Sequence, residues 1–378
     1  MEEEKYIEYK GGSLRPRRSP WMWFVDLALT AVTVVMGIAM PMIYAVPHVD
    51  PARMWIFPVL ALAVPALYVL TVLLACYWIV RWRLFRAGWM VVLVVAGLFG
   101  VSLFWKPQLE RTYGAGYSER GTFRVMSYNV RYFHDDEGRS SADRIAELID
   151  SLKPDVICFQ EFNARLAEES DRFAELKTRY ESARFGLDEE AEPEQTILSR
   201  YRVVRSGVLL TPESSVWADV AIGDDTVRIY NNHLQSTAIK ASDNDYIVHR
   251  GFIGDTAREV KLRSIAGRLR RNGALRAAQV ESIVGAMDPA PELRIVCGDF
   301  NDTPMSYVYR MMSRGLTDAF SECGSGYSHT YRGFFNMLRI DYMLASPALQ
   351  PITYEVPGIE CSDHYPVVVR FKSLAGRN

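Results

Sequence analysis

Three long apolar stretches dominate the N-terminal part of the chain. They extend from Trp21 to about Tyr44, from Trp55 to Val80 and from Gly88 to Trp105, and they contain almost no charged residues. A helix that crosses a bilayer needs about 17–25 such residues. We therefore predict about three transmembrane helices within residues 21–105, the third being the shortest. The first stretch is too long for the apolar region of a signal peptide, and a second one follows closely, which favours a retained anchor.

The pattern changes after a glycine-containing segment, residues 106–122, that we interpret as a linker. Apolar and polar residues alternate from Phe123 to Tyr128, as in a strand. The spacing becomes helical from Ala142 to Leu152, and Pro154 separates this helix from an apolar strand, Val156–Phe159. A strand, a helix and a strand in this order are typical of α/β enzymes, which place functional residues where strands end.

The same criteria predict a long helix and several more strands. The helix extends from Ala257 to Met287, with interruptions at Gly267 and at Asn272-Gly273. Its first half is rich in arginine, which is typical of a solvated helix face, although near a membrane it would also suit anionic headgroups or substrate phosphates. The further strands are Thr196–Leu198, Val203–Leu209, Val216–Ile222, Val227–Asn231, Leu293–Cys297 and Val367–Val369.

The charge of the whole chain is nearly balanced. Its 378 residues include 43 Lys and Arg and 45 Asp and Glu, for a formal net charge of −2. No overall basicity indicates a nucleic-acid partner, and no segment indicates an obligate protein partner. With residues 1–20 as an N-terminal segment and residues 123–378 as a catalytic domain, the length fits one enzyme domain behind a membrane anchor.

The basic residues that flank the apolar stretches are unevenly distributed. Clusters precede the first stretch and separate the second from the third, whereas the first connection holds a single arginine; these residues are Arg15, Arg17, Arg18, Arg81, Arg83, Arg86 and Arg53. By the positive-inside rule, the N-terminus and the second connection are cytoplasmic. Three spans then place the catalytic domain on the extracytoplasmic side of a multi-pass cell-membrane protein. The orientation reverses if the third stretch only lies on the membrane surface.

Six segments carry polar residues suited to phosphate chemistry, most of them next to predicted strands. They are Met126-Ser127-Tyr128-Asn129, Phe159-Gln160-Glu161, Asn232-His233-Leu234-Gln235-Ser236, Gly298-Asp299-Phe300-Asn301-Asp302, Arg339-Ile340-Asp341-Tyr342 and Ser362-Asp363-His364-Tyr365-Pro366. Carboxylate and amide oxygens suit a hard cation such as Mg²⁺, and imidazole can accept a proton near neutral pH. The sequence contains no G-x-S-x-G, H-E-x-x-H or Walker A motif. Five cysteines without CxxC spacing argue against a zinc site or a disulfide scaffold.

Taken in order, from about Phe123 to Phe371, these segments resemble the endonuclease/exonuclease/phosphatase superfamily, which includes deoxyribonuclease I and neutral sphingomyelinases. The resemblance implies an α+β fold, a four-layered α/β-sandwich of the deoxyribonuclease I-like type. It also implies a hydrolase that acts on phosphoester bonds, most simply phosphodiesters, and depends on a divalent metal, Mg²⁺ or Mn²⁺.

The resemblance also implies roles for individual residues. Glu161 would bind the metal, Asn129 would help to orient the metal or the phosphate, and Asp363 would approach the metal or support a neighbouring hydrogen bond. His364 would be the general base, and Asp341 would hold its imidazole in the required tautomer.

Three further residues would act on the phosphate and the water. His233 would donate a hydrogen bond to the scissile phosphate, and Asp299 and Asn301 would orient the attacking water. Whether Asp299 or the metal assists the departing oxygen is left open.

The substrate is open between several classes. An anchor that holds the site near a membrane favours a phospholipid, and the segment from His233 to Ser236 is similar to that of sphingomyelinase-like members. The alternative is a nuclease that acts on external DNA or RNA, or an enzyme for small phosphoesters. A non-catalytic phosphate-binding receptor is a second alternative, which the presence of all eight expected polar residues disfavours.

Overall fold

The computed structural model describes residues 20–54, 56–107, 121–183, 185, 194–210, 214–237 and 256–374. Nearly all of the predicted N-terminal segment, including its three arginines, lies outside these ranges, as does most of the predicted linker at residues 106–122.

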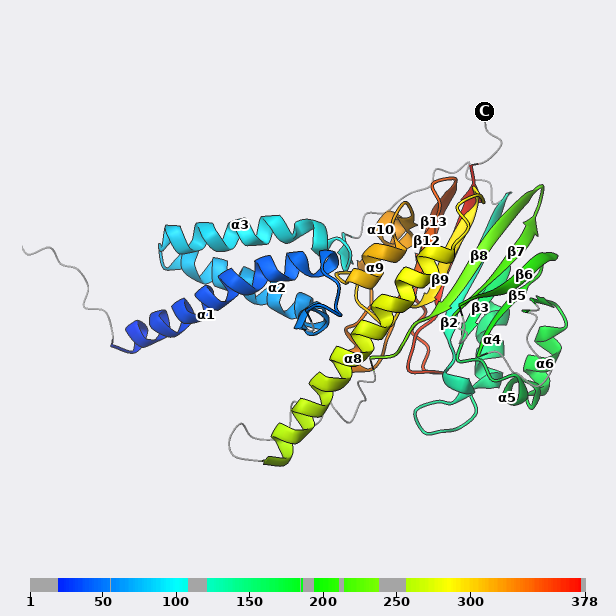
Figure 1. The fold of residues 1–378 in the computed structure, drawn as a ribbon, viewed down its shortest axis with the longest axis horizontal. Helices are drawn as coiled ribbons and strands as arrows, with labels where there is room; N and C mark the ends of the chain where they lie inside the picture. The colour runs from blue at the N-terminus through cyan, green and yellow to red at the C-terminus, as the bar shows by residue number, and fades with distance from the viewer. Residues whose placement is uncertain are drawn as a thin grey trace, which may run out of the picture.

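Three helices form a bundle at one end of the molecule: α1 (Pro20–Ala45), α2 (Ile56–Val80) and α3 (Leu84–Val101) (Figure 1). All three are long and apolar enough to cross a membrane. The third begins and ends earlier than its predicted stretch, and Trp105 lies instead in the short strand β1 (Trp105–Lys106).

The one charge in the first apolar stretch, Asp26, lies at the end of the bundle where α1 begins and α2 ends. Its carboxylate accepts hydrogen bonds from Tyr77 and Arg81, and the Arg81 Nη2 to Asp26 Oδ2 distance is 2.7 Å. Arg81 belongs to the connection between α2 and α3, so the ion pair stabilises the end of the bundle that points away from the sheets (Figure 1).

Two six-stranded sheets form the centre of the rest of the described chain. The first has the order β13-β14-β2-β3-β5-β4, with bounds Leu349–Glu355, Val367–Ser373, Thr122–Asn129, Val156–Gln160, Gln195–Ser199 and Glu181–Ser182. The second has the order β10-β12-β9-β8-β7-β6, with bounds Thr317–Asp318, Asp341–Ala345, Arg294–Asp299, Asp225–His233, Ser215–Ile222 and Val203–Leu210. A small two-stranded sheet pairs β1 with β11 (Gly326–Tyr327).

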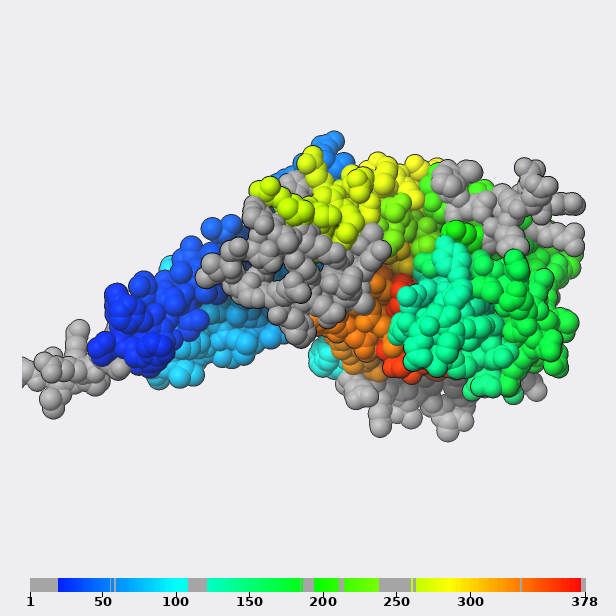
Figure 2. All heavy atoms as spheres, turned by 90° about the horizontal axis from the view of Figure 1, so that it is seen from below, coloured from blue at the N-terminus to red at the C-terminus, as the bar shows by residue number. Residues whose placement is uncertain are grey.

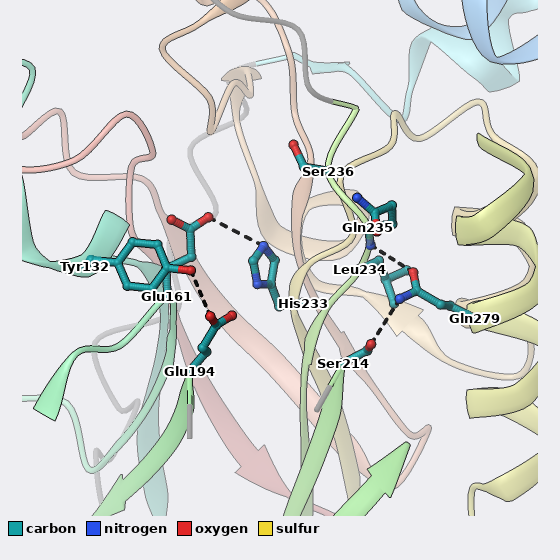
Figure 3. Close-up of a pocket in the computed structure, with 9 residues that line it drawn as sticks. All are labelled: Tyr132, Glu161, Glu194, Ser214, His233, Leu234, Gln235, Ser236 and Gln279. Atoms are coloured by element: carbon teal, nitrogen blue, oxygen red, sulfur yellow. Dashed lines mark hydrogen bonds and ion pairs between the residues drawn. The ribbon is translucent and has the colours of Figure 1, made fainter. Parts of the chain in front are cut away.

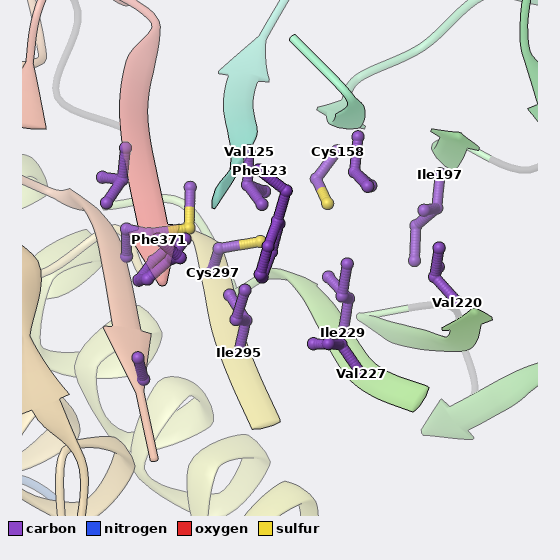
Figure 4. Close-up of a cluster of buried hydrophobic side chains, with 14 of the residues drawn as sticks. Phe123, Val125, Cys158, Ile197, Val220, Val227, Ile229, Ile295, Cys297 and Phe371 are labelled. Atoms are coloured by element: carbon purple, nitrogen blue, oxygen red, sulfur yellow. The ribbon is translucent and has the colours of Figure 1, made fainter. Parts of the chain in front are cut away.

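The two large sheets pack face to face through an apolar core that includes Val125, Cys158, Ile229 and Cys297 (Figure 4). Strand alternation explains this core, because successive side chains of a strand point to opposite faces of its sheet. Val125 points to the second sheet, whereas its neighbour Met126 points to the helices on the outer face.

Helices cover both outer faces of the sheets. Ile149 of α4 and Phe173 of α6 pack on the first sheet, and Val280 of α8 and Val308 of α9 pack on the second. The helices are α4 (Ala142–Leu152), α5 (Ala164–Glu168), α6 (Asp171–Lys177), α8 (Thr256–Ala286), α9 (Tyr307–Met312) and α10 (Ala319–Cys323), with 3₁₀ turns η1 (Val46–His48), η2 (Arg131–Phe133) and η3 (Phe334–Asn336). Two helical layers outside two sheets confirm the predicted four-layered α/β-sandwich.

The predicted interruptions in the long helix are wrong. Helix α8 continues through Gly267 and Asn272-Gly273. Glycine costs a helix about 1 kcal/mol relative to alanine, and tertiary contacts offset that cost. Asn272 Nδ2 donates to the carbonyl of Ser236 over 2.9 Å, and Leu269 is buried in an apolar cluster.

The bundle packs directly on the sandwich (Figure 2). Leu62 of α2 shares an apolar cluster with Ile265 and Leu269 of α8 and with Ile340, the residue before Asp341. The hydroxyl of Thr303 donates to the carbonyl of Ala61 over 3.2 Å. The sandwich therefore lies at the end of the bundle where α1 and α3 end and α2 begins.

Candidate active site

Three predicted site residues lie in a row across neighbouring strands of the second sheet. Strands β8 and β9 are parallel with His233 opposite Asp299, and β9 and β12 are antiparallel with Asp341 opposite Asp299. The register of the sheet thus brings three residues from distant parts of the sequence to one edge.

The first sheet contributes Asn129 and Glu161 from the ends of β2 and β3, where Asn129 lies opposite Gln160. The Asn129 amide is buried, and its Nδ2 donates to Glu161 Oε1 and to Asp299 Oδ2, each over 3.1 Å. Because these acceptors belong to different sheets, Asn129 connects the two halves of the site.

Two site residues have a left-handed backbone: Glu161 with a φ of 49° and Asn301 with a φ of 52°. Such a conformation costs a non-glycine residue roughly 1–3 kcal/mol and is concentrated at functional sites. Glu161 directly follows the last residue of β3, and Asn301 lies two residues after the last residue of β9. At both positions the unusual φ turns the chain away from the strand direction. The backbone therefore stores strain where side chains of the site leave the sheets.

His364 and Asp341 form a buried pair. His364 Nδ1 lies 3.0 Å from Asp341 Oδ2, and His364 Nε2 lies 3.6 Å from Asp299 Oδ2. The Tyr331 ring packs against the imidazole with a centroid distance of 4.9 Å. One imidazole nitrogen is thus held by a carboxylate, while the other points toward the rest of the site.

Burial and charge separate the protonation states of the two histidines. Burial would lower the pKa of His364, but the carboxylates of Asp341 and Asp299 outweigh it and hold that pKa well above its ordinary value. Burial lowers the pKa of His233 to about 4, and the charge of His364 acts in the same direction. His233 is therefore neutral near pH 7.

Burial also acts on the carboxylates. It raises the pKa of Asp299 to about 7 against the opposing effect of His364. It raises the pKa of Glu161 as well, against the hydrogen bond from Asn129. The positive charges and hydrogen-bond donors of the protein therefore compensate only part of the negative charge that Asp299 and Glu161 would carry when ionised.

A cavity of about 570 Å³ opens beside these residues (Figure 3). Glu161 and His233 face each other across it, with His233 Nε2 3.6 Å from Glu161 Oε1. Its lining consists of Tyr132, Glu161, Glu194, Ser214, His233, Leu234, Gln235, Ser236 and Gln279. The cavity connects the buried polar residues with the solvent.

The donor set fits a divalent cation. Two carboxylates, those of Glu161 and Asp299, converge on one amide, and the donor atoms of Asp299, Asp341 and His364 lie within 4.8 Å of one another. In the described part of the chain, the buried Asp341 Oδ1 has no hydrogen-bond partner. His364 Nδ1 and Asp341 Oδ2 already bond to each other, and the oxygens of Glu161 and Asn129 could also hold a hard cation.

Asn301 and Asp363 are the two remaining predicted residues. Asn301 Nδ2 donates to Asp299 Oδ2 and to the carbonyl of Leu234, over 3.1 and 3.0 Å, so its amide holds Asp299 in place. Asp363 lies beside the site: its Oδ2 is 4.0 Å from Arg131 Nε and its side chain is 32% exposed.

Several residues of the site carry no sequence signal of their own. The Thr330 hydroxyl accepts hydrogen bonds from the backbone N–H groups of Ile340 and Asp341, both over 3.0 Å, which fixes the start of β12. Tyr331 packs on His364, and Gln279 of α8 lines the cavity on the side away from Glu161 (Figure 3). None of these residues belongs to a motif, and only the fold brings them to the site.

Comparisons with known proteins identify the family that the sequence resembles. A sequence model of the Endonuclease/Exonuclease/phosphatase family matches residues 126–364. A second family model, described as a domain of unknown function, matches residues 23–104. A search of curated proteins finds no match.

Three solved structures illustrate the similarity. An endonuclease/exonuclease/phosphatase family protein from Bacteroides thetaiotaomicron is 18% identical, covers 68% of this chain and 97% of its own, and has a TM-score of 0.48. A mannosyl-6-phosphatase of the same organism is 19% identical, with coverages of 66% and 99% and a TM-score of 0.47. A humanized D. rerio TDP2 is 17% identical, with coverages of 67% and 100% and a TM-score of 0.46.

The family model covers more than half of the chain, from the strand that carries Asn129 to His364, and so includes all eight predicted site residues. The chain therefore belongs to the endonuclease/exonuclease/phosphatase family, and it is a hydrolase of phosphoester bonds.

Proposed function

We propose that this protein is a membrane-anchored, divalent-metal-dependent phosphodiesterase in which His364 activates the attacking water. The observation that carries the proposal is the buried His364–Asp341 pair, with Nδ1 and Oδ2 3.0 Å apart and Nε2 directed toward Asp299. A carboxylate on one nitrogen fixes the tautomer and orientation of the ring, and the other nitrogen accepts a proton from water.

Glu161 and Asn129 would hold Mg²⁺ or Mn²⁺, with Asp363 beside them. When bound, the cation would supply positive charge to the phosphate and favour the neutral form of the nearby imidazole. The raised pKa of Glu161, caused mainly by burial, supports this assignment, because it indicates negative charge that the protein does not compensate.

His233 and the Asp299–Asn301 pair would act on the phosphate and the water. A neutral His233 has one N–H to donate to a phosphate oxygen, which stabilises charge that grows in the transition state. Asn301 holds the Asp299 carboxylate through two hydrogen bonds, and this arrangement would keep the water in line with the phosphorus atom.

A phospholipid phosphodiester is the substrate class that the surroundings favour. The bundle packs against the sandwich, so a membrane around the bundle would lie close to the site. The cavity lining includes the carboxylates of Glu161 and Glu194 and, among the described residues, no Lys or Arg. Nucleic-acid binding relies on basic contacts to successive phosphates, which this lining does not offer.

We also propose that the bundle spans a cell membrane with the sandwich on the extracytoplasmic side. The connection that holds Arg81 and Arg83 lies at the opposite end of the bundle from the sheets (Figure 1). With this basic end cytoplasmic, the sandwich lies outside.

The test is Glu161→Gln in the full-length protein, reconstituted and assayed with Mg²⁺ on bis-p-nitrophenyl phosphate, a sphingomyelin analogue and plasmid DNA. Mutation of a residue that supports a metal ligand typically lowers metal affinity or activity by roughly 10–100-fold. Loss of the metal ligand itself should cost more, so we expect at least about 100-fold lower turnover. Thermal stability should change little. Glu194→Gln is the matched control, since it removes a carboxylate from the same cavity.

Turnover near the native level by Glu161→Gln at limiting Mg²⁺ would refute the metal assignment. Activity of the native protein on DNA but not on the sphingomyelin analogue would replace the lipid substrate with a nucleic acid. Inactivity on all three substrates, with Mg²⁺ and with Mn²⁺, would overturn the proposed phosphodiesterase.

A further inference from the structure

A second cavity lies at the junction between the bundle and the sandwich. Its volume is about 540 Å³, and none of its described lining residues also lines the active-site cavity. Its walls come from the ends of α1 and α3, the 3₁₀ turn η1, strand β1 and helix α9. Because α1 and α3 end here, the cavity lies where the proposed membrane meets water.

The bundle side of this cavity is apolar and open to the outside. Ala96 and Phe99 of α3 line it, and Phe99 is 79% exposed. Tyr44 and Leu103 continue the same wall. Exposed apolar side chains on a membrane-spanning helix face acyl chains, so this wall would be continuous with the lipid phase.

The sandwich side carries positive charge. Lys106 of β1 and Arg310 of α9 line it, together with His48 of η1. Among the residues that the structure describes, no carboxylate lies within ion-pair distance of Lys106 or Arg310. Asp318, the one acidic residue among the described lining residues, is buried and paired with Arg339.

We propose that this cavity binds an anionic phospholipid from the outer leaflet, with its phosphate between Lys106 and Arg310 and one acyl chain along Phe99 and Ala96. The combination of an apolar wall and two basic residues at one membrane boundary is what such a lipid requires. The site is separate from the catalytic cavity, and the inference rests on the proposed membrane insertion and not on hydrolysis.

The bound lipid would also touch the chain that leaves the active site. Pro304 and Met305 line the cavity, and they follow directly on the segment that contains Asn301 and Thr303. Met305 packs in the apolar core of the bundle. Occupancy of the cavity would therefore hold this segment in the conformation seen here.

The full-length protein is purified in detergent and incubated with vesicles that contain equal amounts of phosphatidylglycerol and phosphatidylcholine. Native mass spectrometry then counts the lipids retained by the protein. We expect selective retention of phosphatidylglycerol. Each basic residue near a membrane contributes a few-fold to anionic-lipid affinity, so Lys106→Gln with Arg310→Gln should weaken retention about tenfold.

The matched control is Arg270→Gln with Arg271→Gln, which removes two exposed charges from α8 outside the cavity. This variant should retain phosphatidylglycerol as the native protein does, and so should the inactive Glu161→Gln, which separates failure of lipid binding from failure of the proposed hydrolysis. Thermal unfolding of each variant verifies that the protein is folded.

Three outcomes would overturn the proposal. One is equal retention of phosphatidylglycerol by the native protein and the Lys106/Arg310 variant. Another is loss of retention in the α8 control alone, which would place the lipid on that helix. The third is displacement of the lipid by inorganic phosphate alone, which would indicate a site for a soluble anion.

Discussion

At the scale of single residues, the site converges on one oxygen atom, Asp299 Oδ2. It accepts hydrogen bonds from Asn129 Nδ2 and Asn301 Nδ2, each over 3.1 Å, and lies 3.6 Å from His364 Nε2 and 3.9 Å from His233 Nε2. An atom that four polar groups approach holds them in fixed positions relative to one another. Changes at Asp299 or its neighbours should therefore affect both chemistry and stability.

The first prediction concerns the His364–Asp341 pair. General base catalysis contributes about 10²–10⁴-fold, so His364→Ala should lose at least that much in kcat/KM. Asp341→Asn should lose less, because the imidazole remains although it is no longer held. Asp341 raises the pKa of His364, so its removal should move the acidic limb of the pH–rate profile to lower pH.

Residues that act as a unit have non-additive effects. The double variant should accordingly be hardly slower than His364→Ala alone. Losses that multiply in the double variant would show that the two residues act independently, even if each proved essential.

The second prediction concerns the stability of the metal-free protein. Burial raises the pKa of Asp299 from its ordinary value of 3.8 to about 7, so the folded protein binds a proton that the unfolded chain releases. The Asp299 carboxyl therefore contributes to the free energy of unfolding at low pH, and this contribution is lost as the pH rises from about 4 to about 7. His364 has a folded-state pKa above its ordinary value of 6.5, so its own contribution is lost at higher pH.

In EDTA, the thermal unfolding midpoint of the native protein should fall as the pH rises from about 4 to about 7. The midpoint of Asp299→Asn should fall less, because its side chain cannot ionise. Circular dichroism at a series of pH values measures this difference, and Asp363→Asn is a partly exposed control. Parallel curves for native protein and Asp299→Asn would contradict the assignment.

At the scale of elements, the parallel pairing of β8 with β9 depends on close backbone contact at Gly298. Its φ is +124°, and a Cβ at this position would lie 1.9 Å from the carbonyl oxygen of Asn232. Glycine is therefore required for β9 to approach β8 where His233 lies opposite Asp299.

The third prediction is that Gly298→Ala loses activity by at least about 100-fold, because a shift of roughly 1 Å in a catalytic group has an effect of this size, and also lowers the unfolding midpoint. Gly358→Ala is the matched control, since no atom lies within 4 Å of its added Cβ. Native activity and stability in Gly298→Ala would show that the strands tolerate separation at this point.

At the scale of the whole molecule, the bundle and the sandwich meet through buried contacts, including the Thr303 hydroxyl on the Ala61 carbonyl. Helices α1 and α3 end, and α2 begins, on the side of the sandwich. The position of the active site relative to the proposed membrane thus follows from which end of the bundle is cytoplasmic.

The fourth prediction tests this topology. Alkaline phosphatase fused after Asn378 should be active, because that enzyme matures only outside the cytoplasm, and a fusion after Trp82 should be inactive. A green fluorescent protein at the same two positions should give the opposite pattern. Fluorescence from the fusion after Asn378 would mean that the sandwich lies in the cytoplasm.

The sequence by itself determined the local features of this protein. The length of the apolar stretches predicted three helices that could span a membrane, and the periodicity of apolar residues predicted the helix Ala142–Leu152, with the same bounds as α4, and the strands that carry the motifs. Such helices and strands can be recognised in the sequence because the residues of their buried face recur at a regular spacing along a short stretch of chain. Family resemblance, and not the pattern, supplied the four-layered arrangement of the sheets.

The tertiary structure alone decided how these pieces meet. The pairing of His233 with Asp299 depends on strands distant in sequence, and the continuity of α8 depends on contacts that outweigh the preference of Gly273 against helix. The packing of Tyr331 on His364 is equally non-local. The protonation states of the site residues are also decided by the tertiary structure, because the pKa values of buried groups depend on which charges the fold places beside them.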